Sequence, residues 1–364
     1  MAAIFPLFDQ LLAEKGSDLH LSVGYPPMIR KHGELVPLDA PALTVPSVEK
    51  LLQEIVDEPR WQKFRDEWDL DFAYGYETKA RFRANYLMKT TGPGAVFRTI
   101  PSKVLTAKEL NLPEACLRLA ERRAGLVLVT GPTGSGKSTT LAAMLDYINT
   151  TRPGHILTIE DPVEFVHQPK RCLITHREVG LDTPSFQDAI RSAGRENADS
   201  ILVGELRGAE TMRLALQLAS FGVLIFATVH TNSASATIER FVNAFPSEQQ
   251  PQIRGLLADS LAGIVAQQLL RRAEGGGRVA AHEILVSNMG VASAIRESKT
   301  AMLPSLMQAG AREGMQTMDA CLLKLLQAGT ITAADAMEKA LDKESFARLP
   351  VVREALAGDG TLVE

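Results

Sequence analysis

The sequence contains a glycine-rich loop with the residue types and spacing of a phosphate-binding site. Residues 131–139 read GPTGSGKST and fit the pattern G-x-x-x-x-G-K-[ST]. Glycines let such a loop fold so that backbone N–H groups converge on phosphate oxygens, and a following helix adds partial positive charge at its N-terminus. The residues expected to bind the nucleotide are Gly131, Pro132, Thr133, Gly134, Ser135, Gly136, Lys137, Ser138 and Thr139.

Two side chains of this loop have chemistry of their own. Lys137 should reach the β- and γ-phosphates, and the Ser138 hydroxyl should bind Mg²⁺. The loop follows an apolar run at 125–130 and opens a helical pattern at 138–149, which is the context that a P-loop requires. A glycine-rich turn with a buried lysine is the structural alternative, and this context argues against it.

Acidic and imidazole side chains follow the other apolar runs of the same region. These runs alternate with helical patterns, which indicates parallel βαβ units. Ligands bind at the carboxyl ends of parallel strands, so residues there could hold Mg²⁺, orient a water molecule and sense the γ-phosphate. Taken singly, each could instead cap a helix or close a turn. The candidates are Glu160 at the end of the run at 155–160 with Asp161 and Glu164 after it, Glu205 at the end of the run at 200–205, and His230 after the run at 223–229.

Positive charge over the γ-phosphate is scarce, because Lys137 is the only cation expected in this crevice. Three arginines on strands of the first hundred residues are candidates to supply it: Arg81, Arg83 and Arg98. Residues 80–86 alternate with period two and place the arginines opposite an apolar face. A turn is expected at 91–94, followed by a strand at 95–100. Arginine fingers contribute about 10³–10⁵ in rate, whereas a solvated sheet face is the alternative explanation.

Composition is that of an ordinary globular protein. The 364 residues are 45% apolar and 23% charged, which favours about two domains. Lys and Arg number 39 against 43 Asp and Glu, for a net charge of −4, which excludes a globally basic nucleic-acid binder. The three cysteines, Cys116, Cys172 and Cys321, are widely separated, which excludes a disulfide framework and fits a reducing cytosol.

Membrane and secretion signals are not evident in the sequence. No run approaches the roughly 18 apolar residues that a membrane span needs. The N-terminus carries Asp9 and Glu14 and no basic segment, unlike a signal peptide. We therefore expect a cytoplasmic protein with no direct membrane insertion, which reaches a membrane through a partner.

Three segments make up the expected organisation. Residues 1–100 read as a small α+β domain, 101–123 as a linker with one helix, and 124–364 as an α/β domain. Apolar residues from Ile253 to Leu269 fall mainly at three- and four-residue spacings, which predicts an amphipathic helix. The C-terminal part is therefore expected to be mostly helical.

Four segments resemble the motif boxes of the secretion-type hexameric ATPases: GPTGSGKSTTLAAMLDYIN, ILTIEDPVEFVH, SILVGELRGAET and FATVHTNSASATI. GSDLHLSVGYPPMIRKHGELVPL, RFRANY and GGGRVAAHEIL are similar to the pilus-retraction branch of that family. The resemblance extends from about residue 5 to residue 340. It implies a PAS-like N-terminal domain and a RecA-like P-loop ATPase domain with a helical C-terminal part.

The resemblance also implies an activity and partners. It implies an ATP- and Mg²⁺-dependent homohexamer at the cytoplasmic face of the inner membrane, against the platform protein of the pilus base. Such a motor retracts pili and drives twitching motility, with paralogous pilus ATPases as further candidate partners and no nucleic acid. The alternatives are an accessory or regulatory nucleotide-binding ring subunit with weak hydrolysis, an extension or type II secretion ATPase, and a DNA translocase.

By position, the resemblance assigns roles to individual residues. It makes 131–139 the Walker A loop, Glu205 the Walker B glutamate and His230 part of the His box. The Asp box contains Glu160, Asp161 and Glu164. Glu164 is the favoured water activator, and the choice between Glu164 and Glu205 stays open. Arg83 and Arg98 match arginines that clamp the γ-phosphate, with Arg81 as a further candidate.

Several segments depart from the family pattern. Residues 194–199 replace a usual L-R-x-D-P-D, Gly208 replaces an aspartate, and only the second half of the segment tied to retraction survives at 290–297. Gly194 and Gly208 are expected to weaken local helix by about 1 kcal/mol each.

Overall fold

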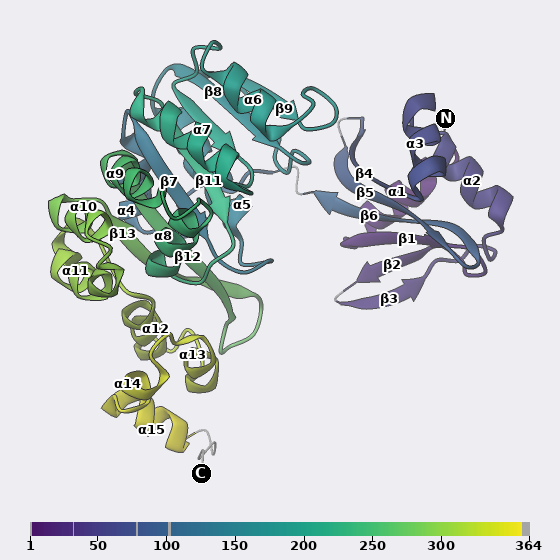
Figure 1. Cartoon of the computed structure of the whole chain (residues 1–364). Coiled ribbons are helices and arrows are strands. Elements are labelled where there is room, and N and C mark those ends of the chain that lie inside the picture. Colours follow the sequence, from purple (N-terminus) through teal and green to yellow (C-terminus); the bar gives the residue numbers. More distant parts are fainter. Residues whose placement is uncertain (1, 32, 78, 101–102, 359–364) are drawn as a thin grey trace. The chain divides into compact units, whose positions relative to one another are not determined.

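The computed structural model describes residues 2–31, 33–77, 79–100 and 103–358, which form two compact units (Figure 1). The first unit comprises residues 1–103 with 162–166, and the second comprises 104–161 with 167–364. The expected linker begins with residues 101 and 102, which lie outside the described residues. Residues 104–123 of this linker are grouped with the second unit, because Cys116 and Leu119 of helix α4 (Glu114–Glu121) are buried in that unit's core.

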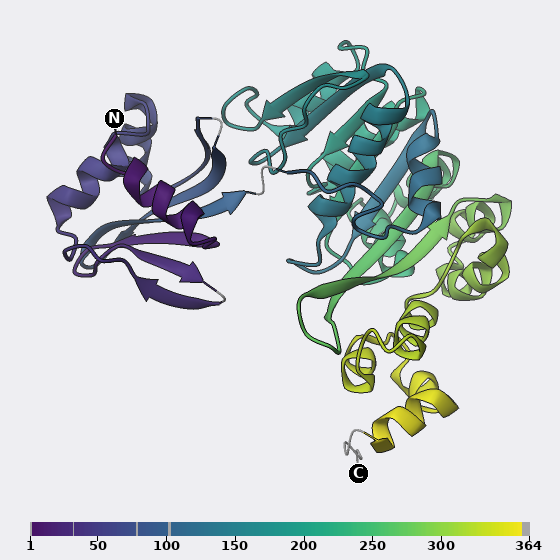
Figure 2. The same cartoon turned by 180° about the vertical axis from the view of Figure 1, so that it is seen from behind.

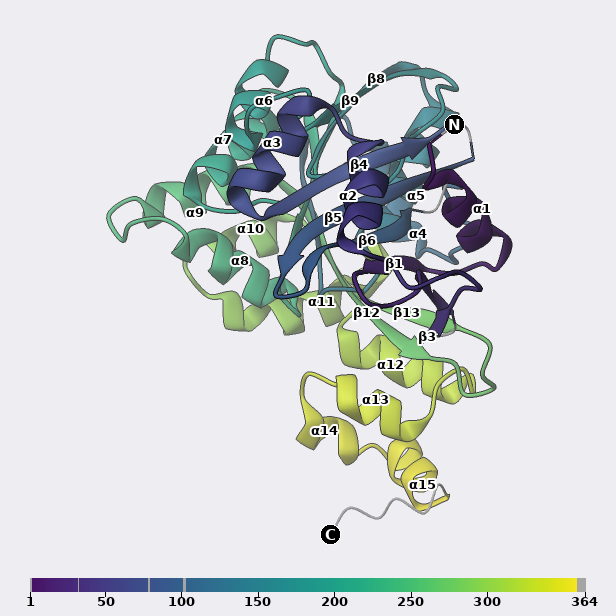
Figure 3. The same cartoon turned by 90° about the vertical axis from the view of Figure 1, so that its right-hand side faces the viewer.

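The first unit is a sheet covered by helices on one face. In its described part the sheet order is β3-β2-β1-β6-β5-β4, and all neighbouring strands are antiparallel. The strands are β1 (Asp18–Ser22), β2 (Met28–Lys31), β3 (Glu34–Pro37), β4 (Asp69–Tyr76), β5 (Ala80–Lys89) and β6 (Gly92–Ile100). Helices α1 (Phe5–Ala13), α2 (Val45–Gln53) and α3 (Glu58–Glu67) pack on the face that carries the aromatic core (Figure 3).

The period-two pattern of the arginine-bearing strand is confirmed. Phe82 and Tyr86 of β5 are fully buried, whereas Arg83 between them is exposed. The turn expected at 91–94 is wrong, because β5 and β6 are joined at residues 90–91 and β6 already contains Pro93. Pro93 lies beyond the last β1–β6 pair, Ser22 with Gly94, so its missing N–H removes no bond to β1.

The second unit is built on a larger, mainly parallel sheet. Over its described residues the order is β13-β12-β7-β11-β10-β8-β9, with only the β12–β13 pair antiparallel. The central strands β7, β10 and β11 are buried along their whole length, as strands covered on both faces are. The strands are β7 (Gly125–Thr130), β8 (Gly154–Glu160), β9 (Cys172–Glu178), β10 (Ser200–Val203), β11 (Leu224–Val229), β12 (Leu261–Arg271) and β13 (Arg278–Val286).

Helices cover both faces of this sheet (Figure 2). Helix α4 and α5 (Lys137–Thr151) share one apolar cluster with the sheet. The other cluster is formed by α6 (Phe186–Ala193), α7 (Ala209–Ser220), α8 (Ala234–Asn243), α9 (Gln250–Ser260), α10 (Met289–Arg296) and α11 (Leu303–Ala309). Besides these two clusters and the aromatic core of the first unit, a fourth apolar cluster includes residues from the end of the β12–β13 hairpin. It joins this end to α12 (Met318–Gln327), α13 (Ala333–Lys339), α14 (Lys343–Ala347) and α15 (Pro350–Gly358).

The single helix predicted from Ile253 to Leu269 is wrong in its second half. Helix α9 ends at Ser260, and the chain continues as strand β12. Because β12 lies between β7 and β13 and is buried on both faces, its apolar residues form a run without period two. Such a run cannot be told from a buried helix by periodicity alone.

The expected weakening by Gly194 and Gly208 is also wrong. Gly194 is the C-cap of α6 and Gly208 the N-cap of α7, so neither lies inside a helix. Gly208 adopts a φ of 82°, a conformation that favours glycine over any other residue. Among the helices that the structure describes, none is long and apolar enough to cross a membrane.

Candidate functional site

The loop at 131–136 joins the carboxyl end of β7 to the first residue of α5. Gly131, Gly134 and Gly136 have φ values of 148°, 79° and 86°, so the chain turns through conformations that favour glycine. The Lys137 side chain lies back over the loop, and its Nζ is 2.9 Å from the carbonyl oxygen of Gly131 and 3.0 Å from that of Pro132. This backbone is a phosphate cradle at a helix N-terminus, with one ammonium group inside it.

Replacing Gly131 with Ala should weaken nucleotide binding by about tenfold or more, because the new residue would be strained at φ 148° and its Cβ would lie 2.2 Å from the carbonyl oxygen of Gln267. Titration with a fluorescent ADP analogue measures the loss. Gly255→Ala is the matched control, since that helical glycine has open space around it. Equal affinity in both variants would contradict the assignment of the loop.

The next strand ends bring a carboxylate, an imidazole and a guanidinium together. His230 Nε2 lies 3.3 Å from Oε1 of Glu205, and Arg207 Nη2 lies 2.8 Å from Oε2 of the same carboxylate. Burial acts to raise the pKa of Glu205, but the hydrogen bond and charge of Arg207, with the charge of His230, outweigh it and lower that pKa. Glu205 is therefore held ionised at the edge of the sheet where the P-loop lies.

The prediction that Lys137 is the only cation in this crevice is wrong, because Arg207 binds Glu205 there. The chain after β10 stays non-helical until Gly208, and residues two apart in an extended segment lie on the same side. The spacing Glu205-Leu206-Arg207 brings the two side chains together only because this segment is not helical, and the residues themselves do not require that. The hydrogen bond to Glu205 raises the pKa of Arg207 most, and the negative charges of Glu205 and Asp161 also raise it.

The three carboxylates at the end of β8 and directly after it are placed differently from one another. Glu160 is the last residue of the strand and is 7% exposed. A Cβ on Gly204 would lie 3.4 Å from the Cα of Glu160, so the strand ends that bear Glu160 and Glu205 are in contact. Asp161 is exposed. Glu164 is also exposed, within the segment 162–166 that is grouped with the first unit.

Hydroxyl groups join the P-loop strand to the segment that follows His230. Thr130 Oγ1 accepts a hydrogen bond from the Thr231 N–H at 2.9 Å, and the Thr231 and Thr237 hydroxyls are 2.6 Å apart. Helix α8 then begins at Ala234, whose N–H donates to Glu283 Oε1 at 2.7 Å. Glu283 also accepts from the first N–H of α12 at 3.3 Å, and burial raises its pKa against the effect of these two bonds. One buried carboxylate therefore holds the start of two helices.

Glu283→Ala should lower the free energy of unfolding by about 3 kcal/mol, because two helix N-termini lose the buried carboxyl group that accepts hydrogen bonds from both of them. Urea unfolding followed by circular dichroism measures this loss. Glu344→Ala, at a side chain that is 86% exposed, is the control. Similar unfolding midpoints for the two variants would show that Glu283 has no such role.

The candidate arginines of the first unit lie on the sheet face opposite the aromatic core. Arg83 and Arg98 are directly opposite each other on β5 and β6, and both are exposed, while Arg81 is partly buried. Arg98 Nε donates to Asp18 Oδ1 at 2.8 Å. Burial acts to raise the pKa of Asp18, but hydrogen bonds from Ser17 and Arg98 outweigh it and lower that pKa. Asp18 thus orients Arg98 across the sheet face.

The Ser138 hydroxyl is half-buried in the first turn of α5, directly after Lys137. Mg²⁺ keeps several waters and takes few protein oxygens beside phosphate oxygens, so one hydroxyl at this place fits it. No group of three or more His, Cys, Asp or Glu side chains that could hold a metal ion occurs among the described residues.

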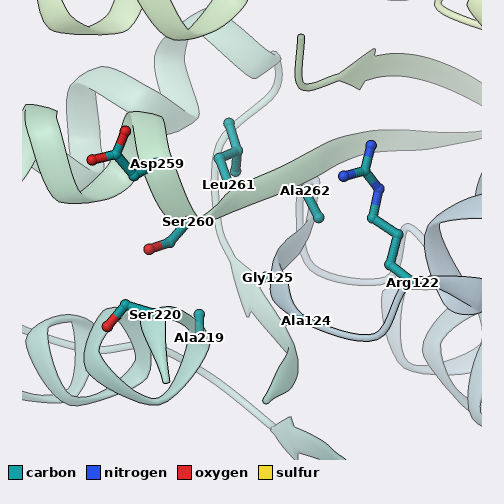
Figure 4. Close-up of a pocket in the computed structure, with 9 residues that line it drawn as sticks. All are labelled: Arg122, Ala124, Gly125, Ala219, Ser220, Asp259, Ser260, Leu261 and Ala262. Carbon is teal, nitrogen blue, oxygen red and sulfur yellow. The ribbon is translucent and has the colours of Figure 1, made fainter. Parts of the chain in front are cut away.

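A cavity of about 240 Å³ lies elsewhere in the second unit (Figure 4). Gly125 and Leu261, which line it, are the first residues of β7 and β12, so the cavity is at the amino ends of these strands. The P-loop follows the carboxyl end of β7. The cavity is therefore at the opposite edge of the sheet from the phosphate cradle.

Comparison with known proteins places this fold and site in a class. Residues 70–337 match the family described as "Type II/IV secretion system protein". The chain belongs to this family, and the RecA-like fold class with an added N-terminal domain is confirmed.

Individual relatives are similar over almost the whole chain. It is 50% identical over 330 residues to "Type IV pilus retractation ATPase PilT" of Pseudomonas aeruginosa, covering 91% of this chain and 96% of that one. It is 46% identical over 320 residues to "Twitching motility protein" of Neisseria gonorrhoeae, covering 88% and 86%. The solved structure described as "Crystal Structure of the Pilus Retraction Motor PilT and Bound ADP" superposes with a TM-score of 0.89 at 44% identity, covering 95% of this chain and 99% of that one.

Proposed function

We propose that this protein is an ATP-hydrolysing motor that retracts type IV pili and so drives twitching motility. The observation that carries the proposal is the ionised Glu205, held by Arg207 and His230 at the sheet edge that also bears the P-loop. The similarity to a pilus retraction ATPase supports the coupling of hydrolysis to retraction.

In the proposed mechanism, Mg²⁺ held by the Ser138 hydroxyl would supply positive charge to the phosphates, and residues of this chain bind the nucleotide and orient the water. The loop N–H groups and Lys137 hold the phosphates, and Ser138 gives the metal an oxygen ligand. Glu205 accepts a hydrogen bond from the attacking water and orients it toward the γ-phosphorus. His230, whose Nε2 lies 3.3 Å from Glu205 Oε1, is proposed to sense the γ-phosphate. Glu160, Asp161 and Glu164 remain proposed members of the same acidic site.

Arg83 and Arg98 are proposed to complete the site from the first unit, with Arg81 beside them. They present guanidinium groups on one sheet face, and such groups stabilise the charge that develops on a transferred phosphoryl group. We further propose that the motor is a ring of six identical chains at the cytoplasmic face of the inner membrane, where it acts on the platform protein of the pilus. Paralogous pilus ATPases are further candidate partners.

The functional alternative is an accessory nucleotide-binding ring subunit with weak hydrolysis. The observation that favours it is the departure from the family pattern at 290–297, which forms most of α10 and the residue after it.

Phosphate release by the purified full chain tests the proposal against this alternative. With Mg²⁺ and ATP, the unmodified protein should release phosphate well above the level of a Lys137→Ala variant. Tight ATP binding with no release above that control would instead select the accessory subunit.

A further inference from the structure

Gln267 is a buried glutamine on strand β12, and its side chain contacts the P-loop although it is not part of that loop. Its side chain is 3% exposed. Its Nε2 donates to the carbonyl oxygen of Ser135 at 2.6 Å, and its Oε1 accepts from the Thr140 hydroxyl at 2.7 Å. One amide group therefore bridges the end of the loop and the first turn of α5.

The loop is in contact with this residue at two of its glycines. A Cβ on Gly136 would lie 2.9 Å from Gln267 Nε2, and one on Gly131 would lie 2.2 Å from the Gln267 carbonyl oxygen. This proximity follows from the sheet, because Ala266, the residue before Gln267, pairs with Thr130 at the end of β7. The backbone and side chain of Gln267 thus limit the space on this side of the loop.

The hydrogen bond from Gln267 to the Ser135 carbonyl oxygen fixes the orientation of the Gly136 N–H, a candidate phosphate-binding group of the loop. The peptide that joins Ser135 to Gly136 is planar and trans, so its C=O and its N–H point in opposite directions. With the carbonyl turned toward Gln267, the Gly136 N–H points away from β12. Without Gln267 the peptide could flip and turn an oxygen atom toward the phosphate, where an N–H is needed.

We infer that Gln267 is a positioning residue that aims the Gly136 N–H at the phosphates of the bound nucleotide. This inference rests on the nucleotide site of the proposed function. A residue that acts through this N–H changes the contribution of the phosphates to binding, and leaves the contribution of the adenosine part in place.

Competition binding of ADP and AMP to the purified full chain tests the inference. In Gln267→Leu, the ratio of the AMP to the ADP dissociation constant should fall about tenfold relative to the unmodified protein, since charged hydrogen bonds to phosphate are lost. Gln268→Leu is the matched control, because Gln268 is the next buried glutamine of β12 and its amide donates to the Lys339 carbonyl instead. In Gln268→Leu, the ratio of the AMP to the ADP dissociation constant should stay unchanged.

Two further variants separate positioning from folding. In Gln267→Glu the side chain keeps its size but places a carboxylate oxygen, which cannot donate, near the Ser135 carbonyl. The ratio of the AMP to the ADP dissociation constant should therefore also fall in this variant. Thr140→Val removes only the partner of Oε1 and should keep the ratio near that of the unmodified protein.

Unchanged ratios in Gln267→Leu and Gln267→Glu, or an equal fall in Gln268→Leu, overturn the inference while the proposed function stands. Failure of the unmodified chain to bind ADP overturns both.

Discussion

Glu205→Gln is expected to lower kcat for ATP hydrolysis by about 10²–10³-fold, with little change in the affinity for ATP. The amide keeps the size of the side chain, but it carries no negative charge to polarise the attacking water. It also loses the ion pair with Arg207 and the attraction to His230, both of which hold the carboxylate in place. Steady-state kinetics with a coupled assay, together with equilibrium ATP binding, measure the two parameters separately.

Glu210→Gln is the matched control for this experiment, because Glu210 lies on the next helix and pairs with Arg191 at the surface. It should hydrolyse ATP at the rate of the unmodified protein. If Glu205→Gln retained kcat within a few-fold, the water-orienting group would have to be another carboxylate, with Glu164 the first to test.

Arg98→Ala is expected to lower kcat by about 10³-fold or more, the effect of losing an arginine finger. The truncation removes the guanidinium proposed to meet the γ-phosphate and leaves the P-loop unchanged. Nucleotide affinity should therefore fall much less than kcat does. Single-turnover hydrolysis at saturating ATP measures the loss of the chemical step directly.

Arg98→Ala also leaves Asp18 without the guanidinium of Arg98, and Asp18 is only 4% exposed. Asp18→Asn separates the two effects, since it removes the ion pair while Arg98 stays. That variant should keep most of the activity. Equal losses in Arg98→Ala and Asp18→Asn would mean that Arg98 acts on the fold rather than on the phosphate.

The parts of the fold that the sequence predicts are those with local signals. The run at 125–130 is followed at once by glycines and Lys137, and it is strand β7 to the residue. The alternation around Phe82 in the same way predicts the two faces of β5. Both patterns are set by burial on one or two faces of a strand, which a single segment reveals.

Strand β12 and Arg207 could not be predicted in this way. Strand β12 is central only because β13 pairs with its outer edge, and its apolar run carries no sign of that pairing. Arg207 enters the site because the chain after β10 stays non-helical for several residues, which no pattern in the segment itself requires. The role of Gln267 likewise depends on its sheet neighbour β7, more than 120 residues earlier.

Twitching of a bacterial strain that lacks its own retraction ATPase tests the central claim most directly. Expression of the unmodified chain should restore twitching zones and reduce the number of surface pili, and the Glu205→Gln variant at equal abundance should restore neither. A chain that is stably expressed and hydrolyses ATP, but leaves the strain immotile, would contradict the retraction motor. Restored twitching with Glu205→Gln would contradict the site on which the account is built.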